Sequence, residues 1–133
     1  MAKKIVIMPC SGIGKAYGEI GRQAAYQVAE SRPEVVENAC LARLMIDDLE
    51  TEEQIMNNYV ITVDGCAKDC AKKNVEKVGK TVDKAMRTID VFKDHRDLKP
   101  EGVVNLGEPG MKLADFLAEK LAAEVDRLAG KEE

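Results

Sequence analysis

The stretch VITVDGCAKDCAKKN, residues 60–74, decides the fold. Its first part is apolar and β-branched, which predicts a buried strand over residues 59–63. Its second part has alanine and valine at helical spacing, which predicts a helix over residues 66–78. Cys66 and Cys70 stand in the first turn of that helix. We therefore expect a strand that leads directly into a helix carrying two cysteines.

Strands and helices are expected to alternate along the rest of the chain. The run KKIVIM is bounded by Pro9 and a glycine cluster, and is typical of a central strand buried on both faces. In chain order we expect strands at 3–8, 35–40, 59–63 and 85–92, helices at 16–30, 66–78 and 111–128, a short polar helix or loop at 49–58, and a polar connection at 93–110.

This alternation predicts the fold class. It favours an α/β domain with right-handed crossovers between parallel strands. We expect one domain over residues 1–133, built in three layers from a small, mostly parallel four-stranded sheet flanked by helices, of Rossmann-like or flavodoxin-like type.

Composition limits the classes of function. Of 133 residues, 45% are hydrophobic and 33% charged, which is the balance of a globular domain that folds without staples. The net charge is -4 with both signs interleaved, so we expect no nucleic-acid partner. The first apolar run is too short for a signal peptide or a membrane span. We therefore expect a cytoplasmic protein, in which four cysteines serve as metal ligands or reactive thiols rather than disulfides.

The four cysteines each follow an expected strand. Cys10 follows the first strand, Cys40 stands at the end of the second, and Cys66 and Cys70 follow the third. Ligands of open parallel sheets bind at the carboxyl ends of the strands, so we expect all four thiols at one edge. Four thiolates at about 2.3 Å complete the tetrahedral shell of zinc. Two cysteines one helical turn apart would share a face, and the helix N-terminus would stabilise their thiolates.

Three segments resemble the DGC-domain family of bacterial and archaeal proteins. They are MPCSGIGKAYGEIGRQAAY, CLARL and VDGCAKDCAKK, the last of which contains the signature Asp64, Gly65 and Cys66. The resemblance covers roughly residues 5–80. It implies a zinc ion bound by the family's four cysteines, which correspond here to Cys10, Cys40, Cys66 and Cys70.

We expect a zinc-binding protein that acts in metal handling or sensing, and two other functions stay open. One is a thiol-based redox or sulfur-relay enzyme that uses Cys10 and the Cys66/Cys70 pair. The other is an iron–sulfur protein, because sets of four cysteines also hold iron. A purely structural interpretation is that Cys10 and Cys40 are small buried residues.

The glycines after Cys10 have two interpretations. Gly12, Gly14 and Gly18 lie between a strand and a helix, as in nucleotide-binding turns, but their spacing is degenerate. We prefer a loop whose N–H groups approach the Cys10 sulfur. A phosphatase loop would need arginine where Ala16 stands.

Two further polar residues receive structural roles. Asp64 precedes the expected helix and is interpreted as its N-terminal cap or as a support for the loop glycine. His95 stands among charges in FKDHRD and is expected to be exposed and not a ligand.

Overall fold

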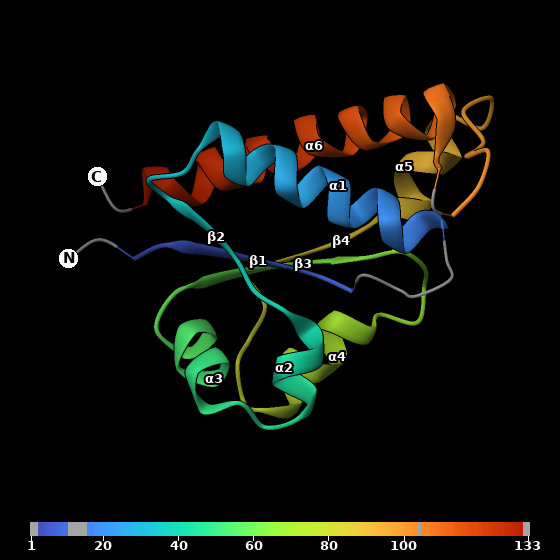
Figure 1. Ribbon diagram of the computed structural model, residues 1–133. Helices are drawn as coiled ribbons and strands as arrows, with labels where there is room; N and C mark the ends of the chain where they lie inside the picture. Colours follow the sequence, from blue (N-terminus) through green and yellow to red (C-terminus); the bar gives the residue numbers. More distant parts are fainter. Residues whose placement is uncertain (1–2, 11–15, 104, 132–133) are drawn as a thin grey trace.

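The computed structural model describes residues 3–10, 16–103 and 105–131 (Figure 1). Strands and helices alternate through most of the chain. In order, the elements are β1 (Ile5–Pro9), α1 (Ala16–Ser31), β2 (Val36–Asn38), α2 (Leu41–Met45), α3 (Leu49–Met56), β3 (Tyr59–Asp64), α4 (Cys70–Lys77), β4 (Lys84–Arg87), α5 (Thr88–Asp94) and α6 (Gly107–Gly130).

The four strands form one parallel sheet in the order β2-β1-β3-β4. Ile7 of β1 pairs with Asn38 of β2 on one side and with Ile61 of β3 on the other. In the pairing of β3 with β4, Asp64 lies opposite Arg87. The chain moves outward from β1 to β2 and then crosses to β3 and β4. The direction of winding therefore reverses between β1 and β3, as at the switch point of flavodoxin-like folds.

Helices cover both faces of the sheet, which confirms the predicted three-layer α/β fold (Figure 1). Side chains alternate across β1, so that Ile5 and Ile7 pack under α1, α5 and α6 while Val6 and Met8 face α2, α3 and α4. All four side chains are at most 1% exposed. Each such side chain stabilises the fold by about 1.5–3 kcal/mol relative to an exposed one.

The predicted outer strand at 85–92 is wrong in its second half. β4 ends at Arg87, and the chain turns at once into the helix α5. Helical geometry buries Val91 in the core and places the Phe92 ring 5.4 Å from that of Tyr17. The apolar residues of this segment fit either period, so tertiary packing decides between them.

The last helix begins at Gly107 instead of Met111. Pro109 is compatible with this start, because the N–H groups of the first helical turn have no partner within the helix. A side chain at Gly110 would place its Cβ 2.7 Å from the Cβ of Leu106, so the glycine allows close packing there.

Among the helices of the described residues, none has both the length and the apolar character that a membrane span needs.

Candidate functional site at the cysteine edge

All four cysteines lie at the carboxyl ends of adjacent strands. Cys10 follows β1 directly, Cys40 lies between β2 and α2, Cys66 follows β3, and Cys70 is the first residue of α4. Because β2, β1 and β3 are neighbours and parallel, their carboxyl ends form one edge of the sheet. The topology therefore brings the three loops that carry the four cysteines to the same edge, as the sequence predicts.

The thiols at this edge are accessible. Cys10 is half-buried, whereas Cys40, Cys66 and Cys70 are exposed. The interpretation of Cys40 as a buried packing residue is therefore wrong. Across 3–10, 16–103 and 105–131, no three His, Cys, Asp or Glu side chains are grouped so as to hold a metal ion. The thiols share an edge in this conformation but do not form a closed shell.

Cys10 is held by hydrogen bonds of both its thiol and its backbone N–H. Its Sγ accepts a hydrogen bond of 3.2 Å from the backbone N–H of Gly65, and its own N–H donates to the Val63 carbonyl at 2.9 Å. A Cβ added at Gly65 would lie 2.8 Å from the backbone N of Gly18 and 3.0 Å from the carbonyl carbon of Tyr17. The signature glycine is thus required by close contact with the first turn of α1, and this contact places its N–H beside the thiol.

Asp64 caps the next helix, which confirms its predicted role. The carboxyl group is buried and accepts hydrogen bonds from the backbone N–H groups of Ala71 (2.8 Å) and Lys72 (3.3 Å). Burial raises the pKa of Asp64 above its ordinary value, although these two hydrogen bonds act in the opposite direction. The N-terminus of α4 therefore already has an internal acceptor.

The predicted helix over 66–78 begins four residues too early. Cys66 lies in a turn, and α4 starts only at Cys70, after Asp69 in the left-handed region (φ 55°). The two cysteines therefore do not share a helix face. The Arg87 guanidinium holds the Asp69 carboxylate through Nε–Oδ1 (2.7 Å) and Nη2–Oδ2 (2.6 Å) contacts.

This ion pair shifts the pKa of both residues. The hydrogen bonds from Arg87 lower the pKa of Asp69, and the Asp69 carboxylate raises the pKa of Arg87. No local sequence pattern marks either residue. They stand 18 positions apart, and only the parallel pairing of β3 with β4 brings them together.

The glycines after Cys10 and the exposure of His95 were also interpreted from the sequence. Gly12 and Gly14 lie outside the described residues, whereas Gly18 is buried in α1 against Gly65. His95 is half-buried, so the expectation of an exposed ring is wrong. Its ring stacks on Phe116 of α6 at a centroid distance of 4.1 Å.

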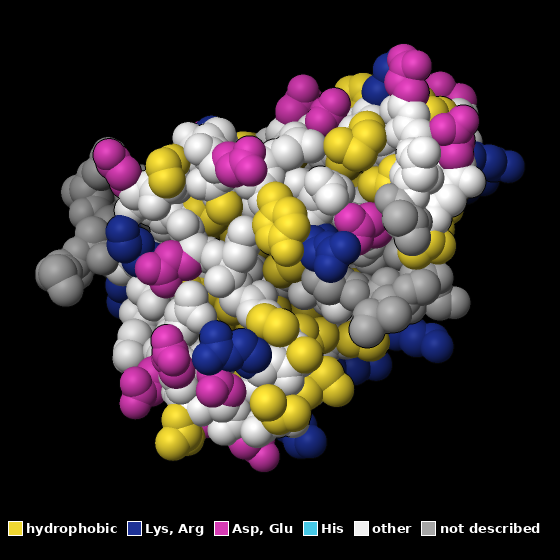
Figure 2. All heavy atoms as spheres, viewed as in Figure 1, with side chains coloured by type: hydrophobic (Ala, Val, Ile, Leu, Met, Phe, Trp, Pro, Cys, Tyr) yellow, Lys and Arg dark blue, Asp and Glu magenta, His cyan; other side chains and the backbone are white. Residues whose placement is uncertain are grey.

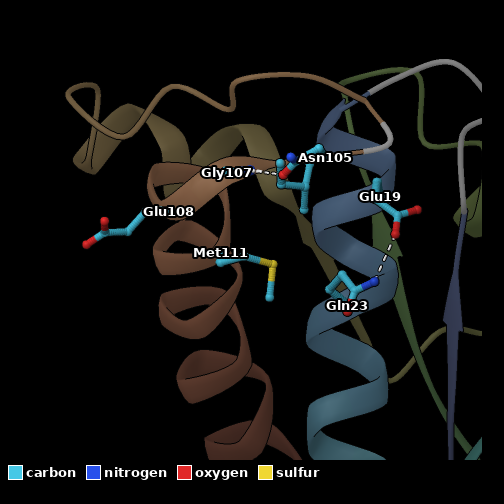
Figure 3. Close-up of a pocket in the computed structure, with 7 residues that line it drawn as sticks. Glu19, Gln23, Asn105, Gly107, Glu108 and Met111 are labelled. Carbon is cyan, nitrogen blue, oxygen red and sulfur yellow. Dashed lines mark hydrogen bonds between the residues drawn. The ribbon is translucent and has the colours of Figure 1, made fainter.

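A separate pocket of about 300 Å³ lies between α1 and the start of α6 (Figure 3). Its polar groups bond to one another: Gln23 donates to Glu19 at 2.9 Å, and the N–H of Gly107 donates to Asn105 at 3.0 Å. Glu108 points away from the gap between the helices (Figure 3). The side chains that line this pocket include no cysteine.

The surface beside the cysteine edge is mixed in character. In Figure 2, Lys and Arg side chains alternate with Asp and Glu over the visible face, and apolar side chains gather over α2. Met45, Ile46 and Leu49, at the junction of α2 and α3, are 61%, 77% and 72% exposed. This face of the molecule therefore carries both charged and apolar surface.

The fold and the site define a parallel α/β domain that carries four thiols at its carboxyl edge. The chain belongs to the DGC domain family, whose family model matches residues 6–108. The match covers every cysteine and ends at the beginning of α6. Searches of curated proteins and of solved structures returned no match.

Proposed function

We propose that the protein binds one zinc ion through Cys10, Cys40, Cys66 and Cys70 and acts in metal handling or sensing. The supporting observation is the placement of all four cysteines at the carboxyl ends of three adjacent parallel strands. Strand topology alone brings these residues, separated by up to sixty positions, to one edge.

The donor set suits zinc in kind and number. Thiolates are preferred zinc ligands, and four of them complete its shell with a net charge of about -2. The N–H of Gly65 already donates to the Cys10 sulfur, and such hydrogen bonds tune thiolate ligands. Because the four cysteines are not grouped in the described residues, zinc binding then requires the loops that carry them to come closer together.

A handling or sensing role agrees with the accessibility of the site. Three of the cysteines are exposed, so a competing thiol from another molecule can reach them. Two clusters of apolar side chains pack the opposite faces of the sheet, and no cysteine is among their fully buried members. We therefore expect the metal-free protein to stay folded, and outright unfolding on chelation would contradict a role beyond structure.

A competition titration with a chromophoric zinc chelator tests the proposal. Wild type should bind one zinc per chain, and each single cysteine-to-serine variant should bind it at least about tenfold more weakly. His95→Gln is the control and should leave the affinity unchanged. Equal affinity in wild type and all four serine variants would contradict the proposal.

A thiol-based redox or sulfur-relay enzyme is the second candidate. The observation in its favour is the hydrogen bond from Gly65 to the half-buried Cys10, with Cys66 next to the donor. Alkylation of the native, as-purified protein at neutral pH separates the two candidates. Rapid modification of Cys10 supports the enzyme, whereas slow modification of all thiols that becomes fast after chelation supports zinc.

An iron–sulfur cluster is a third candidate, and visible absorption of anaerobically purified protein would indicate it.

A further inference from the structure

Among the described residues, three contacts hold the loop that carries Cys66 and Cys70, in addition to the hydrogen bond from Gly65 to Cys10. Asp64 binds the first N–H groups of α4, and Gly65 lies against the backbone of α1. The first of these contacts joins residues on either side of the cysteine pair, and the second precedes Cys66. The third contact, between Asp69 and Arg87, is the one that lies between the two cysteines in sequence.

The third contact fixes an unusual backbone conformation. Asp69 has φ 55° and ψ 45°, a region that few residues other than glycine adopt. Its carbonyl accepts the N–H of Lys73 at 2.8 Å, which begins the hydrogen bonding of α4. The left-handed turn at Asp69 therefore lies where the chain passes from Cys66 into α4.

Arg87 is a firm anchor for the Asp69 carboxylate. It is the last residue of β4 and pairs with Asp64 of β3, so its backbone belongs to the sheet. Its guanidinium makes two parallel contacts with the carboxylate, a geometry that orients as well as attracts. The Asp69 side chain is only 12% exposed, which limits competition from water.

We propose that Arg87 is a positioning residue for the thiol site. Through Asp69 it holds the left-handed turn that sets Cys66 relative to Cys70, without touching either sulfur. This inference rests on the proposed function of the site, and it assigns part of the ligand geometry to a residue 17 positions beyond the last cysteine.

Three variants separate the parts of this contact. Arg87→Met removes the guanidinium but keeps an apolar stem, and Arg87→Lys keeps the charge but removes the planar fork. Asp69→Asn removes the carboxylate charge, while asparagine still tolerates the left-handed region.

The chain contains a matched control. Arg32 holds Asp126 through the same pair of nitrogens, at 2.8 Å and 2.9 Å, and follows α1 near the amino end of β2. Arg32→Met thus removes an equivalent ion pair away from the cysteines. Urea unfolding of both methionine variants shows how much each loses in stability.

The first readout is zinc affinity by chelator competition. We expect Arg87→Met and Asp69→Asn to weaken zinc binding about tenfold, which is the typical loss of affinity when a residue that orients a metal ligand is replaced. Arg87→Lys should not restore it, and Arg32→Met should stay within about twofold of wild type. Equal zinc affinity in Arg87→Met and Arg32→Met would overturn the proposal.

The second readout does not need zinc. In metal-free protein, mass spectrometry of peptides after timed alkylation gives the rate for each cysteine. Arg87→Met should change the ratio of the Cys66 and Cys70 rates at least about threefold while the Cys40 rate stays constant, whereas a general loss of stability would change all three. An unchanged ratio would overturn the positioning role, even if wild type binds no zinc and the proposed function itself fails.

Discussion

The backbone N–H of Gly65 donates a hydrogen bond of 3.2 Å to the Sγ of Cys10. This contact joins the ends of β1 and β3, the two strands between which the winding of the sheet reverses. The glycine of the family signature and the first cysteine of the chain are therefore parts of one local structure.

Replacement of Gly65 should test this local structure. In Gly65→Ala the new methyl would lie 2.8–3.0 Å from backbone atoms of Tyr17 and Gly18, which cannot move without shifting α1. We expect a loss of about 1–3 kcal/mol in the free energy of unfolding, measured with urea. Gly130→Ala is the control, because nothing lies within 4 Å of its added Cβ. Equal stability of the two variants would contradict the close packing.

Loss of the buried cap should destabilise α4. Asp64→Ala leaves the N–H groups of Ala71 and Lys72 without their acceptor, which should cost about 1–3 kcal/mol. Asp64→Asn keeps one acceptor oxygen and should lose less. Thermal unfolding of the two variants gives the comparison, and a larger loss in the asparagine variant would exclude this explanation.

The Arg32–Asp126 pair should make a small, pH-dependent contribution to stability. Hydrogen bonding from Arg32 lowers the pKa of Asp126 in the folded protein. Its contribution is therefore present above the unfolded pKa of about 3.9 and is lost as pH falls through the folded value. The difference between wild type and Asp126→Asn should stay below about 1 kcal/mol at neutral pH and shrink on acidification. A difference that grows toward acid would be the wrong sign.

The last helix should be essential for folding although the family match ends at residue 108. Leu121 is fully buried in the cluster that α6 forms with α1. Leu121→Ala should cost about 2–5 kcal/mol of unfolding free energy. Glu119→Ala, on the exposed side of the same helix, should change it by less than about 0.5 kcal/mol. Similar urea midpoints for the two variants would contradict a structural role for α6.

The architecture could be predicted because the central strands are continuous apolar runs. Residues of β1 and β3 are buried on both faces, and such strands stand out in a sequence without regard to distant contacts. The same pattern placed each cysteine just after a strand. Because parallel strands end on the same side of a sheet, the common edge of the four cysteines was predictable as well.

The errors arose where distant contacts determine the backbone. The spacing of Ala67, Ala71, Val75 and Val78 fits a helix that begins at Cys66. The left-handed turn at Asp69, held by Arg87 18 residues away, delays the start of the helix to Cys70. In α5, packing of Val91 selects a helix over a strand. Local periodicity contains neither kind of information.

The central claim is that the cysteine edge binds zinc. Elemental analysis by mass spectrometry of untagged protein purified anaerobically tests it most directly, for wild type and Cys66→Ser. We expect one zinc per chain in wild type and its loss in the variant. Metal-free wild type with four titratable thiols would contradict the zinc site and favour thiol chemistry instead.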